Sequence, residues 1–185
     1  LLQDVPVSMV TGFNSTLKNI GRINNHGVEI ELSGDIIRKN ELTWSASANA
    51  ALISSKVKKL YRGEDIIWYD PTGGDSRAQY VYREGESTLA FYGYEWAGVD
   101  PANGKSVYYV NDENDPQAGD FTFNGRGATY DYNKANYKII GNGIADVTGG
   151  FSTNVSYRGL EFGLNFIYKI GGSLYDGAYK DVADD

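Results

Sequence analysis

The amino-acid sequence predicts an all-β fold built from antiparallel strands. Of its 185 residues, 15 are Tyr and 23 are Gly, whereas Met occurs once. Tyr favours strands and Gly favours turns, so this composition is typical of a chain with many strands and few helices. The second observation is an alternation of apolar and polar side chains near both ends of the sequence, which predicts two long β-hairpins.

The first predicted hairpin covers residues 28–52, with a polar turn at residues 38–41. Apolar side chains alternate with polar ones along both strands, and the acidic residues among the polar ones are Glu29, Glu31 and Asp35. A period of two gives each strand one apolar and one polar face.

The second predicted hairpin covers residues 151–170 and turns at Arg158-Gly159, with Glu161 on its polar face. Strands of about ten residues are long enough to cross a bilayer at a tilt. An antiparallel sheet with one face in water shows the same alternation. The pattern alone therefore leaves two architectures open, a soluble β-sandwich and a membrane β-barrel.

The chain is expected to have three regions. Residues 1–55 contain the first hairpin, and residues 149–185 contain the second hairpin and the start of the next loop. Residues 56–148 form an insertion that is too long to be a simple connection and should have structure of its own. Its clearest expected element is a hairpin from the run Leu89–Val99 to Lys105–Val110, around a Pro-Gly turn.

Charge and composition exclude several function classes. The formal net charge is −7 and Cys is absent, while His occurs once. The pI near 4.7 argues against a nucleic-acid surface, which needs clustered Lys and Arg. The absence of Cys excludes zinc ribbons and thiol redox centres, and a single His argues against a His-based triad or metal cluster. No catalytic constellation is visible, so we expect a protein that is not an enzyme and needs no cofactor.

Several short strings occur in an order that is specific for one family. They are Asn19-Ile20-Gly21 with Asn25-His26-Gly27-Val28-Glu29, the turn Gly98-Val99-Asp100-Pro101 with Gly104, Ile140-Gly141, Gly149-Gly150-Phe151, and Gly171-Gly172 with Tyr175-Asp176. Together with Asp4-Val5-Pro6-Val7 and Thr11-Gly12, they resemble the SusC/RagA-type TonB-dependent outer-membrane transporters. The resemblance extends over nearly the whole chain.

The resemblance implies a fold and a function. Members of the family are 22-stranded transmembrane β-barrels in the Gram-negative outer membrane, with an N-terminal plug. They import oligosaccharides or peptides beneath a SusD-like lipoprotein lid and are energised by TonB. This chain would supply part of the barrel wall, in contact with outer-membrane lipid, and one large extracellular insertion. It has neither the plug nor the TonB box, so TonB would act through the N-terminal part of the parent protein. The alternative remains a soluble extracellular β-sandwich module that binds glycans.

Two groups of side chains follow from the barrel interpretation. The acidic residues of the polar faces are expected to face the lumen, either guiding a polar solute or as ordinary solvated groups; they are Glu29, Glu31, Asp35 and Glu161. Trp44, beside the first turn, fits an aromatic girdle at the membrane interface, or a core position if the fold is a sandwich.

The insertion is rich in aromatic residues that could bind a substrate or a partner protein. Aromatic rings stack on sugars and anchor protein interfaces. The candidates are Trp68, Tyr69, Tyr94, Trp96 and Tyr108. The alternative is that these rings form the core of the insertion itself.

Turn formation explains the acidic loops better than metal binding does. Oxygen ligands for Ca²⁺ could come from Asp100, Asn103, Asp112, Asn114 and Asp115. Their spacing does not match an EF-hand, and turn formation explains the same residues, so we expect no metal.

Overall fold

A computed structural model describes residues 2–6, 10, 12–13, 15–19, 21–69 and 78–178 of the chain. Over these residues the all-β, antiparallel prediction is confirmed. The chain divides into two compact units. The first comprises Leu1–Gly63, Glu84–Thr88 and Gly143–Ser173, and the second comprises Glu64–Arg83, Leu89–Asn142 and Leu174–Asp185. No helix among the described residues is long and apolar enough to cross a membrane.

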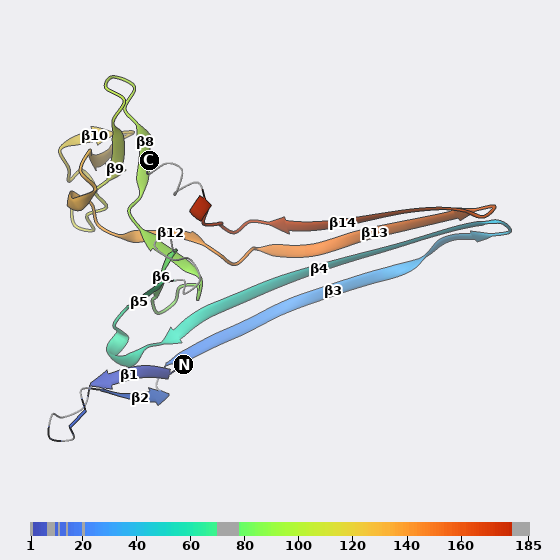
Figure 1. Ribbon diagram of the computed structural model, residues 1–185, viewed down its shortest axis with the longest axis horizontal. Helices are drawn as coiled ribbons and strands as arrows, with labels where there is room; N and C mark the ends of the chain where they lie inside the picture. The colour runs from blue at the N-terminus through green and yellow to red at the C-terminus, as the bar shows by residue number, and fades with distance from the viewer. Residues whose placement is uncertain are drawn as a thin grey trace. The chain divides into compact units, whose positions relative to one another are not determined.

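The first unit is dominated by one four-stranded antiparallel sheet (Figure 1). Its strands are β3 (Arg22–Lys39), β4 (Leu42–Lys59), β13 (Val147–Tyr157) and β14 (Leu160–Ile170), in the order β14-β13-β4-β3. Both predicted long hairpins are present. The strands of the second hairpin have 11 residues each, close to the expected length. Those of the first have 18 each, which corrects the expectation of about ten. The first hairpin continues through polar residues, because the hydrogen bonds between its strands are made by backbone groups. Alternation of side-chain hydropathy gives no information about these backbone hydrogen bonds.

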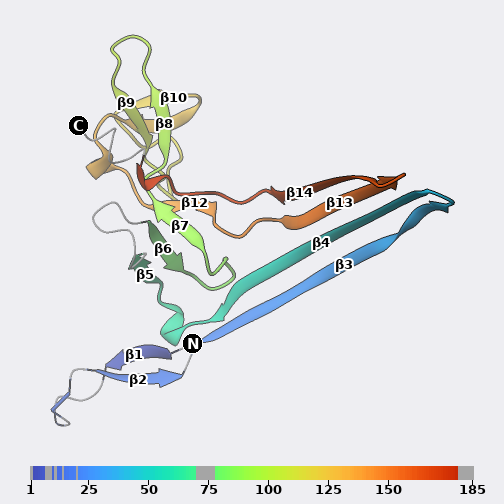
Figure 2. The same cartoon turned by 45° about the vertical axis from the view of Figure 1, so that its right-hand side comes forward.

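The two hairpins are joined side by side, although the insertion separates them in sequence. Strand β13 pairs with β4 in one continuous register from Thr148 opposite Ala51 to Tyr157 opposite Leu42. Both tight turns lie at the same end of the sheet (Figures 1 and 2). There the Nε atom of Arg158 donates to the Glu41 carboxylate at 2.5 Å, and the Arg158 backbone N–H donates to the Glu41 carbonyl at 3.2 Å.

Beyond its pairing with β13, strand β4 is covered by the segment Glu84–Thr88. The backbone N–H of Val57 donates to the Glu86 carbonyl at 3.0 Å, and Gly85 donates to the Val57 carbonyl at 2.8 Å. Val57 is fully buried as a result. A short hairpin of β1 (Leu2–Pro6) and β2 (Ser15–Asn19), and the 3-10 turn η2 (Tyr61–Gly63), complete the first unit.

The second unit contains two small antiparallel sheets. One has the order β12-β7-β6-β5, and the other has the order β10-β11-β9-β8. The strands of the first sheet are β5 (Ile66–Tyr69), β6 (Gln79–Tyr82), β7 (Ala90–Gly93) and β12 (Lys138–Asn142). Those of the second are β8 (Trp96–Val99), β9 (Ser106–Tyr109), β10 (Phe121–Phe123) and β11 (Arg126–Thr129). A 3-10 turn, η4, spans Tyr132–Lys134. The fully buried side chains of the second unit include Val81, Val107 and Ala128.

The predicted third hairpin is confirmed in part. Strands β8 and β9 pair around the turn that contains Pro101 and Gly104. The run from Leu89 to Val99 is not one element, however, because β7 and β8 belong to different sheets. The chain changes sheet at Glu95, whose carbonyl accepts a hydrogen bond of 3.0 Å from the Tyr109 N–H. This hydrogen bond joins Glu95 to β9. Local periodicity could not predict it, because residues 95 and 109 belong to different segments of the chain.

Candidate functional site

The four-stranded sheet of the first unit has two unlike faces. Directly opposite residues of antiparallel strands share a face, and side chains alternate along each strand. The cross-strand partners of Glu29, Glu31, Asp35 and Glu161 are Ala51, Asn49, Ser45 and Ser156. All four acidic candidates therefore lie on one face, which we call the polar face.

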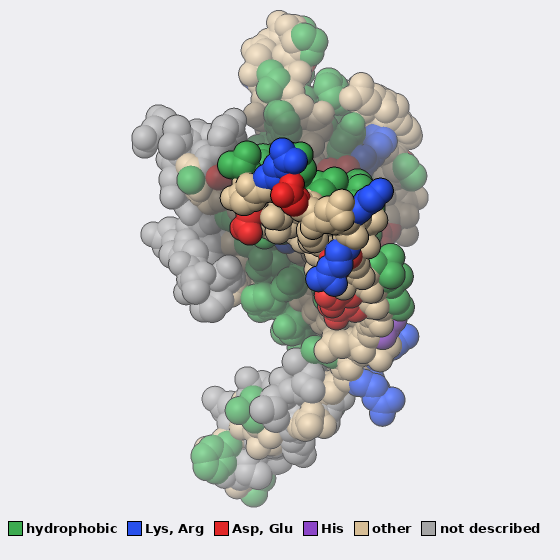
Figure 3. Space-filling view, turned by 90° about the vertical axis from the view of Figure 1, so that its right-hand side faces the viewer, with side chains coloured by type: hydrophobic (Ala, Val, Ile, Leu, Met, Phe, Trp, Pro, Cys, Tyr) green, Lys and Arg blue, Asp and Glu red, His purple; other side chains and the backbone are tan. Residues whose placement is uncertain are grey.

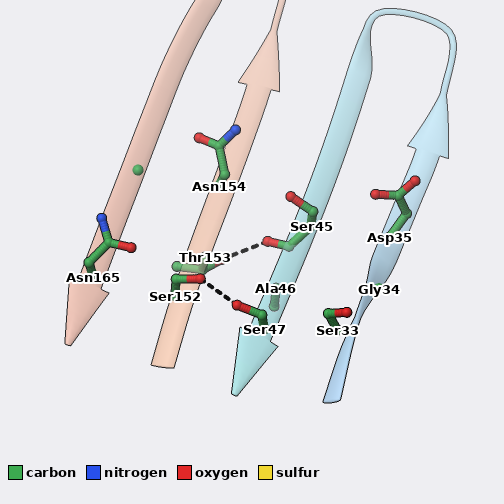
Figure 4. A pocket seen from close by; sticks show the side chains of 11 residues that line it. Ser33, Gly34, Asp35, Ser45, Ala46, Ser47, Ser152, Thr153, Asn154 and Asn165 are labelled. Carbon is green, nitrogen blue, oxygen red and sulfur yellow. Dashed lines mark hydrogen bonds between the residues drawn. The ribbon is translucent and has the colours of Figure 1, made fainter. Parts of the chain in front are cut away.

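Rows of hydroxyl and amide groups accompany these acids on the polar face (Figure 4). One row crosses all four strands, and its members are Ser33, Ser47, Ser152 and Asn165. The Ser47 and Ser152 hydroxyl oxygens are 2.6 Å apart. This row and the next, which contains Asp35, Ser45 and Asn154, line a hollow of about 500 Å³. The site candidates predicted from the sequence were limited to the acidic residues, although these uncharged residues occupy the polar positions of the same alternation.

The opposite face, which we call the apolar face, is uncovered among the described residues. Its side chains include Leu32 and Phe162, which are 71% and 60% exposed. Trp44 lies on this face near the turns, where its indole N–H donates to the Thr153 hydroxyl at 2.8 Å. A sandwich would bury such a face, whereas the wall of a membrane barrel turns it toward lipid. The exposure pattern therefore favours the barrel interpretation over the sandwich.

The aromatic candidates of the insertion divide into packed and exposed rings. Trp68 stacks on Tyr80 with ring centres 4.4 Å apart and planes at 16°, and Tyr80 stacks in turn on Phe91 at 4.8 Å. The indole nitrogen of Trp68 is buried and has no hydrogen-bond partner among the described residues. Trp68 is thus largely part of the packing of its own unit.

Tyr94 and Tyr108 are packed as well. The ring of Tyr94 lies 4.4 Å from that of Tyr137 and 5.4 Å from that of Tyr132, and Tyr108 lies 6.1 Å from Tyr132. In contrast, Trp96 is 59% exposed. The structure thus does not gather the five candidates into one site.

Tyr69 is the other exposed candidate, at 47%. It lies on edge strand β5, whereas Trp96 lies on edge strand β8 of the other sheet. Both side chains are exposed to solvent.

A charged cluster of the second unit was not predicted from the sequence. The Arg126 guanidinium donates two hydrogen bonds to the Glu95 carboxylate, at 2.9 and 2.7 Å, and lies 3.7 Å from the ring centre of Tyr109. Lys138 is 3.5 Å from the same carboxylate. The hydrogen bonds from Arg126 lower the pKa of Glu95 to about 2. Arg126 and Lys138 also line a hollow of about 360 Å³, next to Tyr92. Residues 95 and 126 are far apart in sequence, so no local pattern indicates the pair.

The acidic side chains of the loops around residues 100–103 and 112–115 form hydrogen bonds that are typical of turns. The Asp100 carboxylate accepts hydrogen bonds from the Ala102 backbone N–H at 2.9 Å and from the Tyr130 hydroxyl at 2.6 Å. Asp112 accepts from the Asn114 N–H at 2.8 Å. Within the described ranges, no group of three His, Cys, Asp or Glu side chains is arranged to hold a metal ion.

Comparison with known proteins finds relatives that are named TonB-dependent receptors. No family model matches it. It is 30% identical to TonB-dependent receptor P3 of Formosa agariphila, over 94% of this chain and 18% of that protein. It is 24% identical to TonB-dependent receptor SusC of Bacteroides thetaiotaomicron, over 95% of this chain and 17% of that protein. The chain thus spans less than a fifth of the length of these relatives.

A solved structure agrees with the relatives in fold. The RagAB peptide importer in its open-open state matches with a TM-score of 0.70 and 28% sequence identity, over 92% of this chain and 17% of that one. This fold, the two-faced sheet and the sequence similarity to SusC lead to one conclusion. The chain belongs to the SusC/RagA-type TonB-dependent transporters and corresponds to a segment of them.

Proposed function

We propose that this chain forms part of the wall and one extracellular region of an outer-membrane transporter that imports oligosaccharides or peptides. The observation that carries the proposal is the two-faced sheet assembled from two remote hairpins. Its outer strands β3 and β14 have no further partner strand within the described residues. Open edges of this kind are normally protected, and closure of the sheet into a barrel removes them. A 22-stranded barrel, as in the family, would continue the sheet on both sides.

In this arrangement the apolar face contacts outer-membrane lipid and the polar face lines the lumen. A barrel wall requires side chains that alternate between lipid and water, as those of β13 and β14 do except at Ile167, an apolar side chain on the polar face. Glu29, Glu31, Asp35 and Glu161 then give the lumen a negative wall, and the serine and asparagine rows offer hydrogen bonds to a passing polar solute. Trp44 lies near the turns, at the height of an interfacial aromatic belt.

The second unit is proposed to be extracellular and to contact a SusD-like lipoprotein lid. Short turns on one side of a barrel and long insertions on the other are typical of outer-membrane barrels. Trp96 and Tyr69 are the best candidates for this contact, because they are exposed and Trp and Tyr anchor interfaces. TonB would act on the parent transporter through its N-terminal part.

The test uses the full-length parent transporter. Trp96→Ala and Tyr69→Ala should each weaken co-purification with the lid lipoprotein and reduce nutrient uptake, at normal barrel abundance. Leu174→Ala is the matched control, because Leu174 belongs to the same unit and is also an exposed apolar side chain. Unchanged association and uptake in both ring variants would contradict the role given to the second unit. Absence of the parent from the outer-membrane fraction would contradict the transport proposal as a whole.

A further inference from the structure

A cluster of basic side chains lies at the end of the β3–β4 hairpin that is remote from the turn. Arg22 is directly opposite Lys59, and Lys56 is opposite Asn24. All three basic side chains are exposed. Figure 3 shows basic side chains beside His26, the single histidine of the sequence, on this flank of the first unit.

A β-bulge brings these cations onto one face. Residues an even number of positions apart on one strand share a face. Arg22 is six residues from Val28 and Lys56 is four residues from Leu52, so both basic side chains lie on the face of Val28 and Leu52. The register shifts so that Ile23 is opposite Val57, whereas Arg22 is opposite Lys59. The extra residue in β4 is Lys58, and without it Lys59 would point to the same side as the buried Val57. The bulge therefore adds Lys59 to the apolar face, a role that bulges commonly have.

The cluster lacks acidic partners. Among the described residues, Arg22, Lys56 and Lys59 form no ion pair, whereas Arg38, Arg83, Arg126 and Arg158 each have one. Like charges directly opposite on neighbouring strands repel each other. The chain as a whole has a net charge of −7, so general basic composition does not explain the cluster. An unpaired cluster of this kind fits an anionic ligand from outside the chain.

We propose that Arg22, Lys56 and Lys59 bind the phosphate groups of the outer-leaflet lipid. The inference rests on the proposed function, since it requires the apolar face to contact the membrane. Lys56 follows Leu52, the last apolar side chain of that face on β4, by four residues, or about 13 Å along the strand. At a tilt of about 45° this is about 9 Å of height, just above a headgroup layer about 5 to 8 Å thick, so that the Lys56 side chain has to reach back toward the phosphates. Long basic side chains reach such phosphates while their stems remain on apolar surface.

Lipid is favoured over a soluble anion because the cluster continues the apolar face. A site for a soluble nutrient would be expected on the polar face, with Glu29 and Asp35. The cations are on the other side of the sheet, with Lys56 four residues beyond Leu52 and Arg22 six residues beyond Val28.

The experiment measures lipid retained by the purified full-length parent transporter, by native mass spectrometry. The probes are diphosphorylated lipid A and its dephosphorylated form, with inorganic phosphate as competitor. The triple variant Arg22→Gln, Lys56→Gln, Lys59→Gln should lose about tenfold in its preference for the phosphorylated lipid. The charge-retaining variant Arg22→Lys, Lys56→Arg, Lys59→Arg should keep that preference. Lys169→Gln should keep it as well, because Lys169 is opposite Thr148, on the polar face.

Each outcome decides between defined alternatives. An unchanged preference in the triple variant, with normal nutrient uptake, overturns this inference and leaves the transport proposal intact. Displacement of the lipid by inorganic phosphate at equal concentration would identify a site for a soluble anion and also overturn it. Loss of the preference in Lys169→Gln alone would reverse the assignment of the two faces, and with it the proposed function.

Discussion

The phenolic hydroxyl of Tyr168 donates a hydrogen bond of 2.8 Å to the backbone carbonyl of Asn49, 119 residues away in sequence. Tyr168 is on β14 and Asn49 is on β4, so the side chain reaches across the intervening strand β13. It passes over Gly149, its direct partner on β13. A Cβ atom at this position would lie 2.5 Å from the Tyr168 hydroxyl oxygen and closer still to the Asn49 carbonyl oxygen. Gly149 is therefore needed for this three-strand contact.

We predict that Gly149→Ala destabilises the parent barrel by about 1 to 3 kcal/mol, the usual cost of forcing atoms into a packed site. The measurement is thermal unfolding of the purified transporter. Gly34→Ala is the control, because nothing lies within 4 Å of a Cβ atom at Gly34. Similar unfolding temperatures for the two variants would show that the contact over Gly149 is unimportant.

The assignment of the faces predicts opposite effects for two neighbouring residues. Leu164 is opposite Thr153 on the apolar face, and Asn165 is opposite Ser152 on the polar face. Leu164→Arg should impair the parent barrel by about 2 to 4 kcal/mol, if the residue is near the bilayer midplane. Asn165→Arg should be tolerated in a wet lumen. Outer-membrane abundance measures both, and equal damage would refute the alternation argument.

Trp68 and Trp96 should respond differently to truncation. Trp68→Ala removes a ring stacked on Tyr80 and should lower stability by about 2 kcal/mol or more. Trp96→Ala should leave folding intact, because the ring is mostly exposed. Limited proteolysis of the parent transporter reports the folding of the insertion. Increased cleavage in the Trp96 variant alone would place that ring in the core and remove it as a partner contact.

The ion pair of Glu95 and Arg126 predicts a loss of stability in acid. A carboxyl group whose pKa is lower in the folded protein stabilises it above the unfolded pKa, and that stability is lost as the pH falls through the folded pKa. For Glu95 the window extends from 4.5 down to about 2. The full shift corresponds to about 3 kcal/mol as an upper bound, and partial exposure to solvent lowers it.

Hydrogen exchange in the parent transporter, corrected for the intrinsic pH dependence, tests this window. Protection of the backbone N–H of Tyr109, which donates to the Glu95 carbonyl, should fall between pH 4.5 and 2. In Glu95→Gln this protection should already be lower at neutral pH and should change little in acid. An identical pH profile in wild type and variant would show that the ion pair does not stabilise this junction.

The sequence by itself determined those features that depend on neighbouring residues. Alternation around residues 28–52 and 151–170 located both long hairpins and separated the acidic residues from the apolar ones. The turn residues Asn40 and Gly159 have positive φ angles, which Asn and Gly adopt readily, whereas the positive φ angle of Arg158 has no such explanation in its residue type. The short strings that resemble the family led to the relationship that the comparisons then showed.

Tertiary structure alone decided which remote segments meet. Pairing of β4 with β13 and of Glu95 with Arg126 joins residues that no local period relates. The bulge that places Lys59 on the apolar face depends on the register between two strands, and a shift of one residue reverses every side chain beyond it. Whether an aromatic ring such as Trp68 or Trp96 is packed or exposed depends on what the fold brings against it. The propensity of a single residue carries no information about which segments pack against its side chain.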